Sequence, residues 1–139
     1  LKSIEREYGA AYVAYILVTY LPVPEHIGEM KTKPTQQAIR LLGEQGIMPD
    51  FIVCRSQQPL DDARRKKIEV FANLSSDHII DAPDIASVYE MPLKLEEQQL
   101  GKKLLQHFGL SSQQKPVWQS WNKRVEQIIH PQKRVTIGI

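Results

Sequence analysis

Residues 12–21, YVAYILVTYL, form a continuous apolar run that is rich in β-branched and aromatic side chains. A run of this kind predicts a β-strand that is buried on both faces of a parallel sheet. Pro22 and Pro24 end the strand, because proline cannot donate a hydrogen bond to a sheet. Two shorter apolar stretches, FIVC at residues 51–54 and II at residues 79–80, predict a second and a third strand.

Helical patterns alternate with these strands, and capping or stop residues bound several of them. The predicted helices cover residues 34–45 with a stop at Gly46, residues 61–73 with a cap at Asp61, residues 92–108 as two helices broken near Gly101, and residues 118–129. The alternation predicts an α/β fold with a mainly parallel sheet. Such sheets bind ligands beyond the carboxyl ends of their strands, so a site is expected in the loops after Leu21, Cys54 and Ile80.

Length and composition exclude several classes of protein. The 139 residues suffice for one domain or part of a larger one, and 18 Lys and Arg against 16 Asp and Glu give a net charge of +2. This charge is too small to favour nucleic acid as the main partner. One cysteine cannot form a disulfide framework within the chain, and no apolar run approaches the roughly 20 residues of a membrane span.

Both ends of the sequence indicate a piece of a longer chain. Residues 1–9 have the spacing of the last turns of a helix that stops at Gly9, and they carry no secretory signal pattern. Residues 135–139, VTIGI, have the pattern of a buried strand with no turn signal after it. We therefore expect a segment of a larger, soluble protein from a reducing compartment.

Residues 28–36, GEMKTKPTQ, combine two lysines with hydroxyl and amide side chains at the start of a predicted helix. The first turn of a helix carries unpaired N–H groups and a partial positive charge, and proline suits it because it has no N–H. This pattern indicates an anion site, with phosphate as the expected anion. The alternative is a solvated turn with a good cap. The two are nearly level, and lysines at a helix start favour the site slightly.

The run Arg64-Arg65-Lys66-Lys67 lies on the helix after the second strand. The first three residues are predicted to form a solvated helix face. Lys67 differs, because Phe71 lies one turn further on the same face. A lysine beside an aromatic ring could line a pocket for a phosphate and a base, or it could equally cover the core with its aliphatic stem.

Residues 81–85, DAPDI, follow the third predicted strand. An acidic loop here could accept hydrogen bonds from a ribose or an adenine amine, but a turn made of Asp and Pro needs no function and is the favoured interpretation. Cys54 lies in an apolar strand and is predicted to be a core residue rather than a nucleophile. The four histidines have no metal-ligand spacing.

The stretch GEMKTKPTQ closely resembles the GE-x-KTKPTQ signature of CTP synthase. Further family motifs follow in the same order, and together they cover most of residues 12–109. They are LVTYLPVP at 17–24, GIMPDFIVCRSQQPL at 46–60, KIEVFAN at 67–73, DIASVYEMPLKL at 84–95 and EEQQ at 96–99. The last of these differs from the family motif EEQG, because Gln99 stands where the family has glycine.

The resemblance implies an enzyme that makes CTP from UTP, ATP and glutamine. ATP phosphorylates O4 of the uracil ring, and ammonia from a glutaminase domain then displaces the phosphate. The implied fold is part of a Rossmann-like sheet of the P-loop NTPase and dethiobiotin synthetase type. Residues 1–109 would be the C-terminal half of the synthase (amidoligase) domain, residues 110–134 a linker with one helix, and residues 135–139 the first strand of the glutaminase domain.

The resemblance also implies a set of site residues. Those expected to contact UTP, or the feedback inhibitor CTP at an overlapping site, are Lys31, Thr32, Lys33, Pro34, Thr35, Gln36, Lys67 and Phe71. Asp84 and Ile85 match the adenine-contacting loop for ATP. No catalytic residue and no metal ligand is expected in this segment, so Mg²⁺ would be bound elsewhere in the full enzyme. The segment alone is expected to be inactive.

The expected partners are UTP, CTP, ATP, the remainder of the synthase domain and the glutaminase domain. In the family the nucleotide site lies between subunits of a homotetramer, and a cytoplasmic enzyme is implied. Two other classes of function stay open. One is a non-catalytic α/β module that binds a small anion without preference for pyrimidine nucleotides. The other is an assembly module in which the lysines pair with acidic residues of a neighbour.

Overall fold

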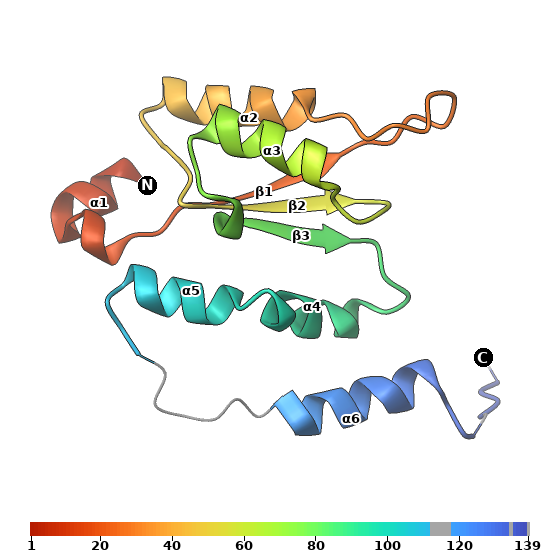
Figure 1. The fold of residues 1–139 in the computed structure, drawn as a ribbon. Helices are drawn as coiled ribbons and strands as arrows, with labels where there is room; N and C mark the ends of the chain where they lie inside the picture. Colours follow the sequence, from red (N-terminus) through yellow and green to blue (C-terminus); the bar gives the residue numbers. More distant parts are fainter. Residues whose placement is uncertain (112–117, 134, 139) are drawn as a thin grey trace.

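The core of the molecule is a three-stranded sheet (Figure 1). The computed structural model describes residues 1–111, 118–133 and 135–138. The strands β1 (Ile16–Leu21), β2 (Phe51–Ser56) and β3 (Ile79–Pro83) lie in the order β1-β2-β3. Both pairings are parallel, with Ile16 opposite Phe51 and Ile52 opposite Ile79. The predicted α/β fold with a parallel sheet is confirmed.

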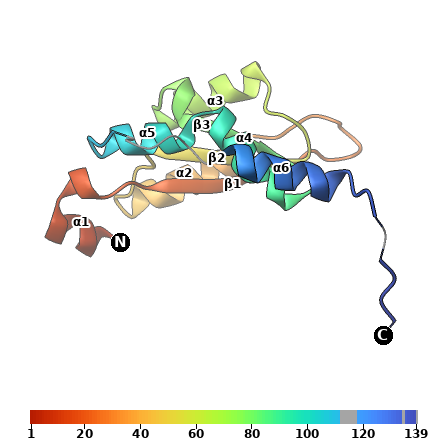
Figure 2. The same ribbon diagram turned by 90° about the horizontal axis from the view of Figure 1, so that it is seen from below.

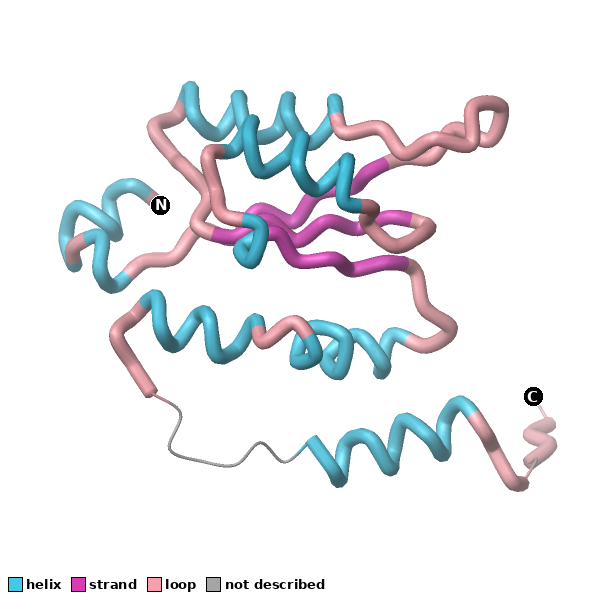
Figure 3. The backbone as a smooth tube through the Cα atoms, viewed as in Figure 1, coloured by secondary structure: helices cyan, strands magenta, loops and turns pink. Residues whose placement is uncertain are grey.

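Helices cover the two faces of this sheet (Figure 3). One face carries α2 and α3, and the other carries α4 and α5, with α6 beyond them. In order, the α-helices are α1 (Lys2–Tyr8), α2 (Lys33–Glu44), α3 (Asp62–Ala72), α4 (Met91–Glu97), α5 (Leu100–His107) and α6 (Trp118–Ile129). Single 3₁₀ turns cover Ala10–Tyr12, Ser76–His78 and Val88–Glu90. No helix in the part of the chain that the structure describes has the length and apolar content needed to cross a membrane.

Strand β2 forms the centre of the core because its side chains alternate between the two faces. Ile52 and Cys54 join the apolar cluster under α2 and α3. Phe51 and Val53 join the cluster under α4 and α5. Three of these four side chains have no exposed surface, and Val53 has 9%. Burying one large apolar side chain stabilises the fold by about 1.5 to 3 kcal/mol, so this strand requires both helical layers.

Strand β1 differs from the prediction of a strand buried on both faces. It is shorter than predicted, and Ile16, Val18 and Tyr20 are exposed by 42%, 63% and 47%. These residues point to the face that carries α4 and α5, but those helices lie over the neighbouring strands (Figure 2). Position at the edge of the sheet, and not composition, therefore leaves one side of β1 uncovered.

The predicted ends of α3 are confirmed. The Asp61 carboxylate accepts a hydrogen bond of 2.8 Å from the backbone N–H of Arg64, which caps the helix start. Asn73 ends the helix with a φ of 52°. Asparagine tolerates this left-handed conformation better than most residues, and it is common at helix ends.

The break between α4 and α5 lies at Gln98 and Gln99, two residues before the predicted position at Gly101. Gln99 has a φ of 57°. This left-handed backbone conformation is sterically unfavourable for any residue with a Cβ, but not for glycine. Gln98 pairs with the outer edge of β3: its amide accepts from the N–H of Asp81 and donates to the carbonyl of Asp81, both at 2.7 Å. The break thus places a side chain where a further strand would otherwise pair.

Four other predictions for the C-terminal half have mixed outcomes. Strand β3 extends to Pro83, so part of the predicted 81–85 loop is strand. The predicted helix at 118–129 is confirmed, and its Trp121 indole N–H donates to the carbonyl of Tyr89 at 3.0 Å. Within the predicted linker at 110–134, residues 112–117 and 134 lie outside the described residues. Residues 135–138, expected to begin a strand, are exposed and form none, because no strand of the sheet lies beside them to pair with.

We predict that Gln99→Gly stabilises the protein. The left-handed conformation costs a residue with a Cβ about 1 to 2 kcal/mol, and the extra freedom of glycine in the unfolded chain costs about 0.5 to 1 kcal/mol. The net gain should be about 0.5 to 1 kcal/mol, seen as a higher urea midpoint. Gln99→Ala is the control, because it shortens the side chain and keeps the Cβ. A glycine variant no more stable than the alanine variant would contradict the prediction.

We also predict that Cys54 does not react while the protein is folded. The side chain is fully buried, and burial raises the pKa of its thiol to about 12. Iodoacetamide attacks the thiolate, which is nearly absent at neutral pH under these conditions. Mass spectrometry should find Cys54 unmodified in native protein and alkylated in urea. Rapid native labelling would show that α2 and α3 do not cover the strand as described.

Candidate functional site

The loop that follows β1 folds back onto the end of that strand. The backbone N–H of Lys31 donates to the carbonyl of Pro22 at 2.9 Å, and that of Gly28 donates to Pro24 at 2.8 Å. These bonds place Lys31 just before α2, at the edge of the sheet where the strands end (Figure 1). The sequence predicted a site at this edge.

The first turn of α2 lacks the side-chain cap that the alternative interpretation required. Thr32 occupies the capping position, but its side chain bonds none of the helix N–H groups. Its hydroxyl instead accepts from the amide of Gln36 at 3.3 Å. Pro34 lies within the first turn, and Lys33 and Pro34 are exposed. This arrangement favours an anion site over a capped turn, because N–H groups of the first turn stay available.

The two threonines of the motif are buried. Thr35 has no exposed surface, and its hydroxyl lies 3.0 Å from the hydroxyl of Thr19 on β1. Thr32 is 7% exposed. The Thr35 side chain therefore holds the start of α2 against β1, and the positive charge that the motif presents comes from its lysines.

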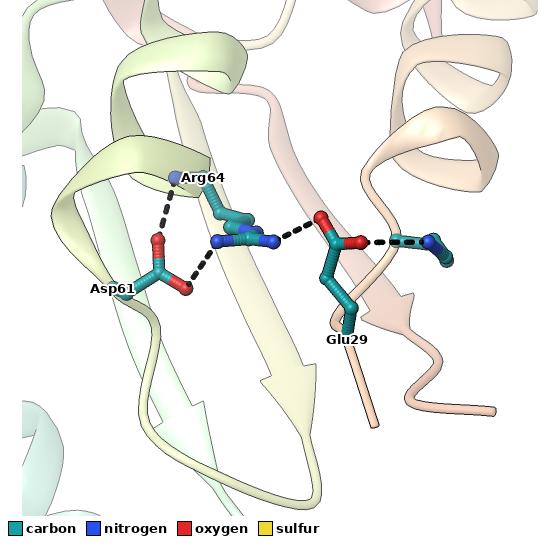
Figure 4. A network of polar contacts seen from close by, with 4 residues as sticks. Glu29, Asp61 and Arg64 are labelled. Atoms are coloured by element: carbon teal, nitrogen blue, oxygen red, sulfur yellow. Dashed lines mark hydrogen bonds and ion pairs between the residues drawn. The ribbon is translucent and has the colours of Figure 1, made fainter. Parts of the chain in front are cut away.

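A network of ion pairs connects this loop to the start of α3 (Figure 4). One carboxylate oxygen of Glu29 lies 3.1 Å from the Lys31 ammonium, and the other accepts from the Arg64 guanidinium. Arg64 also lies 3.3 Å from the carboxylate of Asp61. The hydrogen bond from Lys31, and then the positive charges of Lys31 and Arg64, lower the pKa of Glu29 below its usual value. Glu29 is thus ionised at neutral pH.

Helix α3 carries the remaining predicted contacts to UTP or CTP. Lys67 and Phe71 lie one and two turns after Arg64, on the same stripe of the helix. Lys67 is exposed, and the Phe71 ring is 45% exposed. A cation and a partly exposed aromatic ring therefore follow the Glu29 network along one side of α3.

The prediction of a solvated face for residues 64–66 is wrong for its first two members. The Arg64 side chain is only 21% exposed, because Glu29 and Asp61 hold it. Arg65 donates to the backbone carbonyls of Ser76 and Ile79. Lys66 alone fits the prediction, with its side chain 67% exposed and paired with Glu69.

The two predicted ATP contacts lie directly after β3. The Asp84 carboxylate accepts from the Arg55 guanidinium at 3.0 Å, and its backbone N–H donates to the carbonyl of Ser56 at 2.8 Å. Both partners belong to β2, and Ile85 is half-buried. Asp84 and Ile85 thus share the carboxyl edge of the sheet with the lysine motif, but their contacts are separate from the Glu29 network.

Sequence reasoning missed Glu29 and Arg64 as members of the site. Glu29 stands within the quoted motif, two residues before Lys31, and this proximity was the available signal. Its second partner lies 35 residues further along the chain, and no local pattern reports such a pair. Among the described residues, no three histidine, cysteine or acidic side chains cluster in a way that could bind a metal ion.

Comparison with known proteins gives a consistent result. Residues 1–110 match the family model described as CTP synthase N-terminus. A CTP synthase from Synechococcus sp. (strain JA-3-3Ab) is 40% identical over 139 residues, which is 100% of this chain and 25% of that protein. The CTP synthase of Methanocaldococcus jannaschii is 37% identical over 139 residues, covering 100% of this chain and 26% of the relative.

A third relative, the CTP synthase of Pyrococcus abyssi (strain GE5 / Orsay), is 41% identical over 138 residues, covering 99% of this chain and 26% of that protein. The chain thus spans about a quarter of the length of the curated relatives that it matches. On these grounds the chain belongs to the CTP synthase family.

Proposed function

We propose that this chain is part of an enzyme that makes CTP from UTP, ATP and glutamine-derived ammonia, and that it supplies much of the UTP and CTP phosphate site. The observation that carries the proposal is the position of Lys31 beside the uncapped first turn of α2. Membership in the CTP synthase family supports it. The lysines would act as fixed positive charges that hold phosphate oxygens and offset charge during phosphoryl transfer.

Each residue of the motif has a proposed part in nucleotide binding. Lys31 and Lys33 would contact the phosphates, and the N–H groups of the first turn would add hydrogen bonds. Thr35 would contribute its backbone rather than its hydroxyl, because the hydroxyl is already paired with Thr19. Thr32, Pro34 and Gln36 would shape that turn, through the contact between Gln36 and Thr32 and the fixed φ of proline.

Lys67 and Phe71 would complete this site from α3. Lys67 would meet the phosphates of the same nucleotide, and its exposure leaves its ammonium available. The partly exposed ring of Phe71 lies one turn away on the same stripe. In the family arrangement the site lies between subunits, so we propose that the intact protein is a homotetramer.

Asp84 and Ile85 would contact the adenine of ATP. The Asp84 backbone is fixed to the end of β2, which supports a loop of defined shape at this position. The described residues contain no cluster suited to a metal ion. We therefore assign Mg²⁺ binding to another part of the complete protein, which would also hold the ATP phosphates.

The proposed place of the chain in the complete enzyme follows the order of its motifs. Residues 1–109 would form the C-terminal half of the synthase domain, residues 110–134 a linker with one helix, and residues 135–139 the start of the glutaminase domain. The family match ends at residue 110, and this supports placing the first boundary there. The partners would then be the rest of the synthase domain and the glutaminase domain, in a cytoplasmic enzyme.

We predict that UTP and CTP raise the melting temperature of the complete protein more than inorganic phosphate does. A ligand that binds only the folded state stabilises that state. Lys31→Ala and Lys67→Ala should each remove most of this shift, because each deletes a charge that meets the phosphates. Lys66→Ala is the matched control, since Lys66 lies on the same helix and pairs with Glu69.

The outcomes separate the proposed function from its alternatives. An equal response to phosphate and to both nucleotides would indicate a general anion-binding module. Loss of self-association in Lys31→Ala without any nucleotide present would indicate an assembly module. No shift in the wild-type protein with UTP or CTP would contradict the proposed site.

A further inference from the structure

We propose that Arg64 is a positioning residue that neutralises Glu29 and thereby frees Lys31 to bind the nucleotide phosphates. This inference rests on the proposed function of the site. Arg64 lies outside the motif, and we expect its loss and the loss of the Glu29 charge to change nucleotide binding in opposite directions. The observation behind it is a single carboxylate shared between two cations (Figure 4).

The two cations that share Glu29 are held differently. Arg64 is held by the helix cap, since Asp61 accepts from its backbone N–H at 2.8 Å and lies 3.3 Å from its guanidinium. Its side chain is 21% exposed, whereas that of Lys31 is 36% exposed. Among the described residues, Lys31 has Glu29 as its single ion-pair partner. Lys31 is therefore the cation that can move to an incoming phosphate, while Arg64 stays with Glu29.

The charge of Glu29 affects how an anionic ligand can bind at Lys31. A carboxylate 3.1 Å from Lys31 competes with phosphate for the ammonium and repels the phosphate oxygens. A guanidinium keeps its charge at every relevant pH and binds carboxylates strongly through its fork of donors. With Arg64 present, Glu29 keeps a partner when Lys31 leaves. Without Arg64, Glu29 would hold Lys31 and oppose the ligand with an unshielded negative charge.

A merely structural role for the pair makes a different prediction. If the contact between Glu29 and Arg64 only tied the loop to α3, loss of either residue would loosen the site. Both single variants would then bind nucleotide more weakly, and removing both would not help. Charge neutralisation predicts opposite signs for the two single variants and recovery in the double variant.

The test measures UTP dissociation constants for the complete protein by calorimetry, without ATP so that no reaction occurs. We expect Arg64→Ala to weaken UTP binding roughly tenfold. This is the expected effect of repulsion between an unneutralised Glu29 carboxylate and a phosphate charge about 6 Å away at an intermediate dielectric constant. Glu29→Gln should strengthen binding several-fold, and Glu29→Gln/Arg64→Ala should bind within about twofold of wild type. Arg64→Lys, which keeps the charge, should retain most of the affinity, and Lys66→Ala should change nothing.

Melting temperatures without nucleotide show that each variant is folded, and loss of a partly exposed ion pair should change them little. Weaker binding in both single variants, with no recovery in the double variant, would overturn the inference and leave the proposed function intact. An unchanged affinity of Arg64→Ala for UTP would also overturn the inference without affecting the proposed function. No UTP or CTP binding by the wild-type protein would overturn the proposed function and the inference together.

Discussion

Burial of β2 on both faces is the constraint on which the rest of the structure depends. A central parallel strand has apolar side chains on each side, so it requires a helical layer above and another below. Phe51 and Ile52 are neighbours in sequence, yet they belong to different clusters. For this reason, helices α2 and α3 pack on one face of the sheet and α4 and α5 pack on the other. The direction of each connection follows, because parallel strands need a crossover between them.

Parallel pairing also decides where chemistry can occur. All three strands end at the same edge, so the loops after β1 and β3 and the turn before α3 meet there. Lys31, Asp61 and Asp84 stand far apart in sequence, and each directly follows a strand or precedes a helix at this edge. The contact between the buried Thr35 hydroxyl and the Thr19 hydroxyl fixes the start of α2 over β1. The core thus positions the lysine motif, and Met30 of the motif is itself buried in the apolar cluster under α2 and α3.

Under the proposed function, the charges at this edge matter more for ligand binding than for stability. Ion pairs that remain partly exposed to solvent, as these do, contribute little to the free energy of folding. The network of Glu29, Arg64 and Asp61 nevertheless controls the surroundings of Lys31, because it fixes a negative charge beside that ammonium and supplies a compensating positive one. A site for a highly charged ligand needs such compensation, since its own cations would otherwise pair with the nearest carboxylates.

The sequence by itself determined the presence and order of the strands, most helix bounds and the Asp61 cap, because each depends on neighbours within a few residues. It also carried the motifs that identify the family. The tertiary structure alone decided the exposure of Val18, the fate of Arg64 and Arg65, and the helix break at Gln99. Coverage of β1 depends on where α4 and α5 lie, and the partner of Arg64 lies 35 residues away. Local sequence patterns indicate the secondary structure of a segment. Side-chain exposure and ion pairing depend on which elements the tertiary fold packs beside that segment.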